Sequence, residues 1–234
     1  MNEIVKKITV DLYSVQMKWV AWYLPIVYVF YFSLVWFLNE PEIRSMSLIT
    51  FTFQTATIFM LICGILSSLA FLPMYIKHGV TRKSYFQGAF LSSLALGTTI
   101  IGVSGILTWL LSLFNMNVFA EVVLSSLGVN NWFWTIISYT IVVIIYFLAG
   151  WLVGLAFLRY GPSGGFISIG IALVIVVVND LLWAFSTPKP LMGVFNLDIP
   201  VPHVAIAIVG SIILAALSTQ MIYRIVKDTP IKVG

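Results

Sequence analysis

The chain has 234 residues, of which 61% are apolar and only 9% are charged, and its mean hydropathy is +1.06. Because a soluble domain carries about 25% charged residues, this composition excludes an ordinary soluble protein and indicates an integral membrane protein. The formal net charge is +4. Cys63 is the single cysteine, which excludes an intrachain disulfide and a cysteine zinc site.

Six stretches are long and apolar enough to cross a hydrocarbon core of ~30 Å as helices, which takes about 20 residues each. They cover residues 19–38, 48–72, 89–114, 132–158, 165–185 and 204–223. Barrel strands would be shorter and would alternate in polarity, and an isolated strand leaves backbone groups unpaired in lipid. The sequence therefore predicts an all-α bundle of six transmembrane helices at 19–223, followed by a tail at 224–234.

Lysine and arginine residues are shared unevenly between the two sides of this predicted bundle. If the N-terminus is inside the cell, all of them except Arg44 and Lys189 fall in the tails and loops of the cytoplasmic side. Positive residues accumulate on the cytoplasmic side of membrane proteins. We therefore expect both termini to be cytoplasmic, in a multi-pass protein of the cell membrane.

Residues 1–18, which precede the first predicted span, have a helical pattern of their own. Apolar residues recur at Ile4, Ile8, Leu12 and Val15, with lysines on the opposite face. This pattern is typical of an amphipathic helix that lies in the membrane interface and contacts anionic lipid. A frayed basic tail is the alternative interpretation.

The connection between the second and third spans combines positive charge with turn signals. Pro73 ends or kinks the preceding helix, Gly79 permits a turn, and Thr81 or Ser84 can cap the next helix. We expect a short helix parallel to the membrane that presents its charges to the cytosol or to lipid phosphates. A loop that only fixes the topology is the alternative. The candidate docking residues are Lys77, His78, Gly79, Val80, Thr81, Arg82, Lys83, Ser84 and Tyr85.

The stretch from Ile76 to Phe86, with Gly-Val-Thr-Arg-Lys at its centre, resembles a loop of bacterial ABC-2 type transporter permeases. The expected architecture is similar as well, with an interfacial helix, six spans and both ends inside. The resemblance implies that Lys77 to Tyr85 form a coupling helix that inserts into a groove of a cytoplasmic ABC ATPase. It also implies that the pathway is built with a second copy of the permease or a related one.

No nucleotide-binding domain is expected in this chain itself. Its connections are too short to hold one, and a P-loop ending in Gly-Lys-Ser or Gly-Lys-Thr does not occur. ATP and Mg²⁺ are therefore expected on the partner ATPase, with no cofactor or metal in this chain. We expect membrane lipid as a further partner and no nucleic acid.

The family also places short re-entrant helices between the fifth and sixth spans, on the outer side. Here the corresponding region is 186–202, in which four prolines bracket an apolar turn. Prolines prevent a continuous helix but allow a short hairpin that dips back to the membrane. A plain proline-rich loop is the alternative.

Asp180 is the only charged residue within the predicted spans. A charge at the centre of a membrane helix costs ~2.5 to 3.5 kcal/mol and usually faces a bundle interior or a cavity. Asp180 lies ~22 Å along its helix from the inner end, in the outer third. Asn179 and Asp180 therefore either line a substrate exit or mark the outer boundary of the span.

Small residues suggest close helix packing in two spans. Gly150 and Gly154 form a GxxxG pattern in the fourth span, and Ser93 and Gly97 are spaced similarly in the third. Such patterns are compatible with dimerisation or with tight packing inside one chain.

These observations favour a permease over two other classes. With the direction of transport and the separate ATPase taken from the resemblance, we expect a non-enzymatic permease subunit in a bacterial plasma membrane that exports a hydrophobic or amphipathic cargo (a peptide, antibiotic or lipid). The alternative is the substrate-capturing membrane subunit of an energy-coupling importer, although the spans lack a polar cluster for a ligand. An enzyme would need several His, Asp or Glu residues together, but His78 and His203 lie on opposite sides.

Overall fold

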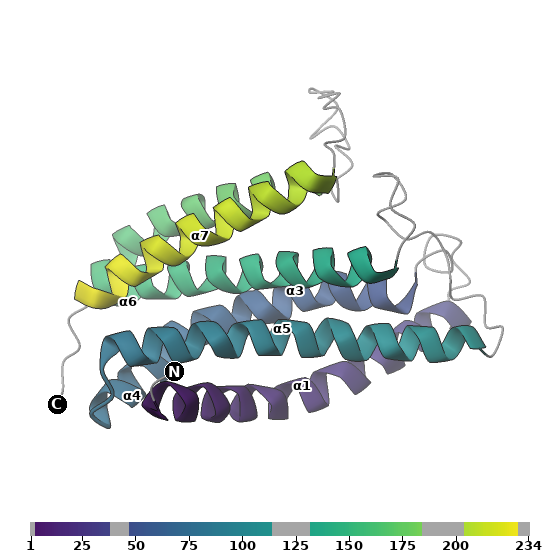
Figure 1. Cartoon of the computed structure of the whole chain (residues 1–234), viewed down its shortest axis with the longest axis horizontal. Coiled ribbons are helices and arrows are strands. Elements are labelled where there is room, and N and C mark those ends of the chain that lie inside the picture. The colour runs from purple at the N-terminus through teal and green to yellow at the C-terminus, as the bar shows by residue number, and fades with distance from the viewer. Residues whose placement is uncertain (1–2, 38–46, 114–131, 184–203, 229–234) are drawn as a thin grey trace.

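The chain is helical almost throughout the part that the computed structural model describes, residues 3–37, 47–113, 132–183 and 204–228 (Figure 1). The elements are α1 (Glu3–Phe37), α3 (Leu48–Leu66), the π-helix η1 (Ser67–Phe71), α4 (Leu72–Lys77), α5 (Arg82–Leu113), α6 (Trp132–Leu182) and α7 (Val204–Asp228). Five helical stretches in these ranges are long and apolar enough to cross a membrane, with α3, η1 and α4 counted as one. The all-helical class is confirmed, and the stretches are compatible with a multi-pass membrane protein.

The helix α6 folds back on itself at Gly161, whose φ of 69° and ψ of −162° are not helical. The hydroxyl of Tyr146 donates a hydrogen bond of 2.8 Å to Asp180, although a straight helix would separate these residues by roughly 50 Å. Gly161 takes the positive φ without steric cost, and Pro162 has the φ that suits the start of a new helix. The fourth and fifth predicted spans are therefore the two arms of α6, 132–160 and 162–182.

The second predicted span continues beyond its predicted end at residue 72, as far as Lys77. Pro73 does not end this helix, as one of the predicted alternatives had it; the helix type changes just before it instead. A proline ring clashes with the carbonyl four residues earlier and offers no N–H. The five residues before α4 form the π-helix η1, in which Leu72 N–H bonds to the Ser67 carbonyl. The wider turn lets the chain pass Pro73 without leaving the helix.

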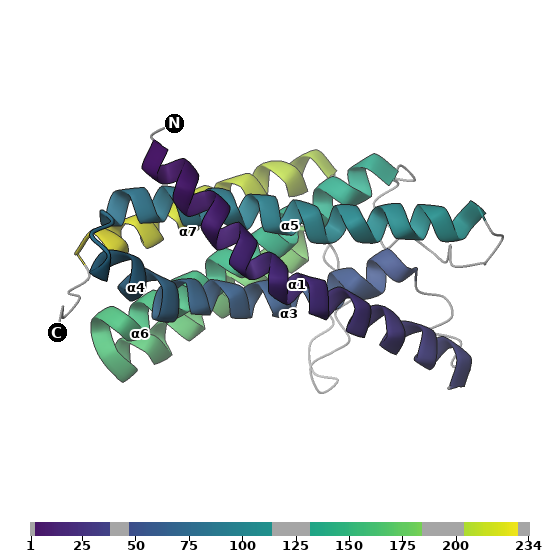
Figure 2. The same cartoon turned by 90° about the horizontal axis from the view of Figure 1, so that it is seen from below.

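The N-terminal segment and the first predicted span form one uninterrupted helix, α1, which crosses obliquely over α5 and α3 (Figure 2). Ile8 and Leu12, predicted on a stripe facing lipid, are buried inside the protein instead. Ile4 is half exposed and Val15 is partly exposed. The buried face follows spacings of four residues through Gln16, a polar position that a count of apolar residues alone passes over.

Glycines bring α3 against the first arm of α6, which lies at the centre of the core. A Cβ at Gly150 would collide with the carbonyl oxygen of Leu61, one at Gly64 with that of Phe147, and one at Gly154 with the Ser68 hydroxyl. Tyr139, Leu148 and Trp151 on the same arm are fully buried. Within the described residues, the GxxxG pattern thus serves packing inside one chain.

The beginning of α1, the α4–α5 turn, the Gly161 turn and the end of α7 lie at one end of the bundle (Figure 1). All described lysines and arginines except Lys18 lie within about two helical turns of this end. We call it the cationic end. Asp180, by contrast, lies towards the opposite end.

We predict that Gly150→Ala lowers the thermal unfolding midpoint of the purified protein in detergent by several degrees. The added methyl group has only the α3 backbone to displace, and overpacking of this kind costs about 1 to 3 kcal/mol. Gly170→Ala is the matched control, since a Cβ at Gly170 meets nothing within 4 Å and alanine favours the helix. Equal midpoints for the two variants would contradict the close approach of α3 and α6.

Candidate functional site

The turn between α4 and α5 is a tight and well-bonded structure. Gly79 N–H bonds to the Ile76 carbonyl at 2.9 Å and Val80 N–H bonds to the Tyr75 carbonyl at 3.1 Å. Gly79 has a φ of 82°. Two such bonds around a glycine of positive φ form a Schellman motif, which satisfies carbonyls at a helix C-terminus. The sequence correctly places the turn at Gly79.

Thr81 caps the helix that follows the turn. Its hydroxyl oxygen accepts a hydrogen bond of 3.2 Å from the backbone N–H of Ser84. This is the N-cap arrangement, in which a side chain satisfies one of the first free N–H groups of a helix. Of the two predicted caps, Thr81 is the one used, and α5 begins directly at Arg82.

A separate short helix along the membrane is therefore not what the structure contains at 73–88. Residues up to Lys77 belong to the helix that enters the turn, and residues from Arg82 belong to the one that leaves it. The reason is the pair of caps, which end one helix and start the next within four residues. The predicted docking residues form the rigid tip of a helical hairpin.

The nine predicted docking residues differ in exposure. Lys77, His78, Gly79, Thr81 and Lys83 are exposed, whereas Val80, Arg82 and Ser84 are partly buried. Tyr85 is fully buried, so its side chain is not available to a partner. The residues that present a surface are therefore those on the tip itself, with Lys77 and Lys83 as its exposed cations.

Tyr85 instead anchors the tip to the interior of the bundle. Its hydroxyl donates a hydrogen bond to the Ser67 carbonyl, the same oxygen that accepts the Leu72 N–H in the π-helix. Its ring lies 5.5 Å from that of Tyr75 and 6.5 Å from that of Trp151, measured between centroids. The first turn of α5 is thus fixed to η1.

Gln16 extends this buried polar cluster to α1. Its amide nitrogen donates to the Ser67 hydroxyl and its amide oxygen accepts from the Ser92 hydroxyl, both at 3.4 Å. The side chain is 1% exposed. The sequence analysis missed this residue, although a signal exists, because Gln16 is a polar residue spaced by four from Leu12 and Val20 on a buried face.

The N-terminal part of α1 is tied to the hairpin at two further places. The Tyr75 hydroxyl donates to the carboxylate of Asp11. A Cβ on Gly88 would come within 2.6 Å of the Ile8 side chain, so α1 and α5 approach closely there. A displacement of the hairpin would therefore also displace α1.

Two arginines hold the end of α7 at the cationic end. Arg82 Nη1 donates to the Lys227 carbonyl at 3.2 Å, and Arg159 Nη1 donates to the Ile225 carbonyl at 3.4 Å. The last carbonyls of a helix lack partners within it and carry partial negative charge, which favours cations. Arg82 thus links the hairpin tip to α7.

Asn179 and Asp180, the predicted pathway residues, occupy contacts between helices. Asn179 is fully buried, and its amide oxygen accepts from the Ser211 hydroxyl at 3.1 Å, which itself accepts from Trp183 Nε1 at 2.8 Å. Asp180 is partly buried and accepts from Tyr146. These bonds join the second arm of α6 to α7 and to the first arm. They are distant from the cationic end.

Within the described ranges, no group of three or more His, Cys, Asp or Glu side chains is placed to hold a metal ion. The predicted re-entrant region, 186–202, lies outside the described residues, as do Arg44, Lys189 and His203. The candidate site is therefore the hairpin tip with its anchors.

Comparison with known proteins gave no match to a family model, to a curated protein or to a solved structure.

We predict that Gly79→Val lowers the unfolding midpoint by a few degrees, because a left-handed backbone costs an ordinary residue about 1 to 2 kcal/mol. Space does not contribute, since a Cβ at Gly79 meets nothing within 4 Å. Gly79→Asn is the control, because asparagine tolerates this conformation. If valine and asparagine had the same effect, the turn would not have the positive φ described.

Proposed function

We propose that this chain is the transmembrane permease subunit of an ABC transporter, driven by a separate cytoplasmic ATPase. Counting the two arms of α6 separately gives six spans. The positive-inside rule then assigns the cationic end to the cytoplasm, together with both termini. The proposed setting is a bacterial plasma membrane, and the proposed cargo is hydrophobic or amphipathic.

The observation that carries this proposal is the connection of an exposed cationic tip to buried anchors. Lys77 and Lys83 are exposed at the tip, whereas Tyr85, two residues further along, is bonded to the Ser67 carbonyl inside the bundle. A loop that only fixes topology needs charge but no such anchoring. A coupling element needs both, since a force on the tip has to move the spans behind it.

The anchors distribute such a force over several helices. The tip lies between α4 and α5, the bond from Tyr75 to Asp11 connects α4 to α1, and Arg82 connects the tip to the end of α7. A partner that closes on ATP and pushes the tip would thereby shift several spans together. Alternating access by rigid-body movement of packed helices is a known type of transition. A second permease copy or a related chain would complete the pathway.

We predict that the chain, purified in mild detergent from the cells that make it, carries a stoichiometric ATPase polypeptide, and that Lys83→Glu removes it. Lys83 is exposed in the first turn of α5, where an acidic residue is favourable to the helix. The substitution should therefore reverse the surface charge without unfolding the hairpin. The measurement is ATP hydrolysis per mole of permease in the purified sample.

Lys7→Glu provides the control, since Lys7 is an exposed cation of α1 at the same end but outside the hairpin. We expect it to retain the ATPase. Unchanged hydrolysis in the Lys83→Glu sample would contradict the coupling role. Hydrolysis by the permease polypeptide alone, freed of any companion, would contradict the proposed function as a whole.

A further inference from the structure

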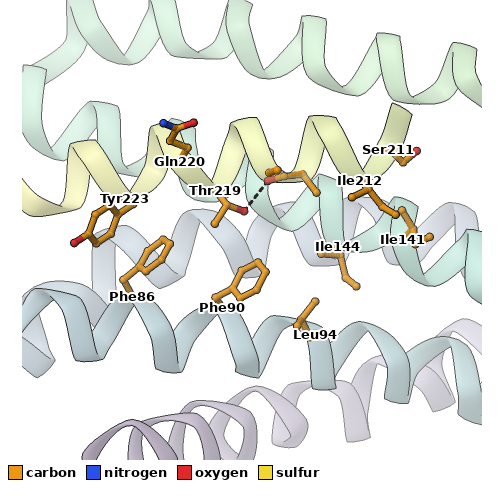
Figure 3. Close-up of a pocket in the computed structure, with 12 residues that line it drawn as sticks. Phe86, Phe90, Leu94, Ile141, Ile144, Ser211, Ile212, Thr219, Gln220 and Tyr223 are labelled. Atoms are coloured by element: carbon orange, nitrogen blue, oxygen red, sulfur yellow. Dashed lines mark hydrogen bonds between the residues drawn. The ribbon is translucent and has the colours of Figure 1, made fainter. Parts of the chain in front are cut away.

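A crevice of about 600 Å³ runs between α5, the first arm of α6 and α7 (Figure 3). Phe86, Phe90 and Leu94 line one side from α5, and Tyr223, Thr219 and Ile212 line the other from α7. Ligand cavities in proteins measure ~300 to 1,000 Å³, so the space suffices for a ligand. Neither the hairpin anchors nor the Asn179 contacts fill it.

The lining of the crevice is mostly apolar, and its polar groups are the Gln220 amide and the hydroxyls of Ser211, Thr219 and Tyr223. The Thr219 hydroxyl donates to the Ala215 carbonyl at 2.6 Å. The Ser211 hydroxyl is engaged with Asn179 and Trp183. The Ser211 and Thr219 hydroxyls are therefore satisfied within the protein, and with apolar side chains over most of its lining the crevice suits a hydrocarbon chain better than a polar ligand.

The crevice opens on the outer surface of the bundle rather than into a closed interior. Ile212 is 57% exposed and Tyr223 is 38% exposed, although both line it. Along α7, these two residues lie roughly 17 Å apart. One leaflet of a hydrocarbon core of ~30 Å is about as thick. The length and the direction of the crevice, parallel to the spanning helices, therefore match one acyl chain of one leaflet.

Positive charge lies at one mouth of the crevice. The rings of Phe86 and Tyr223 line this end, with centroids 5.2 Å apart. One helical turn further out, Arg82 on α5 donates to the Lys227 carbonyl on α7. The buried Nε of Arg82 has no hydrogen-bond partner among the described residues. The acidic side chains that the structure describes, Glu3, Asp11 and Asp180, all lie on other helices.

We propose that this crevice holds one acyl chain of an anionic phospholipid, whose phosphate lies against Arg82 at the cationic end. The apolar lining accounts for the chain, the lateral opening for entry from the bilayer, and the guanidinium for the preference for a negative headgroup. Arginine suits phosphate because its planar fork presents several donors. The bound lipid would fill the gap between α5 and α7 next to the hairpin tip. The inference does not depend on a partner ATPase.

The test uses the full chain, purified alone in detergent and stripped of lipid. Phosphatidylglycerol and phosphatidylcholine with identical acyl chains are titrated in turn, and native mass spectrometry counts the lipids retained per chain. We expect one retained phosphatidylglycerol, bound roughly fivefold more tightly than phosphatidylcholine, the preference that one cation near an anionic headgroup supplies. Equal retention of the two lipids would contradict the proposal that Arg82 selects an anionic headgroup at this mouth.

Two pairs of variants locate the lipid. Ala216→Trp fills the crevice and should abolish retention of both lipids, whereas Ala205→Trp places the same bulk on an exposed position of α7 outside it. Arg82→Gln should remove the preference for phosphatidylglycerol but not binding, and Arg82→Lys should preserve it. Lys7→Gln, which removes a cation elsewhere at this end, should behave like the unmodified protein.

Several outcomes overturn the proposal. Retention by Ala216→Trp equal to that by Ala205→Trp would place the lipid elsewhere on the bundle. If Ala216→Trp changed the oligomeric state and not the lipid count, the crevice would belong to a contact with a second copy. The unfolding midpoint of Ala216→Trp shows whether this variant folds. If it does not, Ala216→Leu, which adds a smaller side chain to the crevice, supplies the same comparison.

Discussion

The structure depends on the close approach of α3 to the first arm of α6. Gly64, Gly150 and Gly154 allow the two backbones to come into direct contact, and Gly154 lies against Ser68 of the π-helix. In a membrane, where lipid tails are as apolar as the side chains, packing of small residues is a main source of helix association. This contact sets the position of η1, and the position of η1 sets that of α4, of the Ser67 carbonyl and of the hairpin tip.

Buried polar contacts fix α1 and α5 against the π-helix that the glycine contact positions. Tyr85 and Gln16 converge on Ser67 from α5 and α1, so three helices meet at one residue of the π-helix. Buried polar groups are costly when unpaired, and in an apolar surrounding they favour the one arrangement that satisfies them all. A π-turn inside a helix frequently marks a functional position. Here it lies one short helix away from the exposed lysines.

The sequence predicted the class of the fold, the presence of several long apolar helices and the position of the turn, because apolar length and a glycine followed by a capping threonine are local signals. It did not predict the burial of Tyr85 or the role of Gln16, since both depend on which helices meet. Gly79 and Thr81 were each recognised in the sequence as turn and cap residues. That the two caps together leave room only for a hairpin tip, and not for a separate surface helix, depends on how closely they follow each other in the folded chain. Likewise, the predicted spans 132–158 and 165–185 left a connection of six residues, whereas in the structure only Gly161 departs from the helical backbone.

The most direct measurement of the proposed coupling is photocrosslinking from the tip in intact cells. A photoreactive lysine analogue that keeps the positive charge, in place of Lys83, tests the exposed tip. The same residue in place of Phe133, exposed at the start of α6 and far from the cationic end, is the reference. The account predicts an adduct between position 83 and a nucleotide-hydrolysing polypeptide, with none from position 133. Adducts from position 83 that contain only lipid or a second copy of this chain would contradict it.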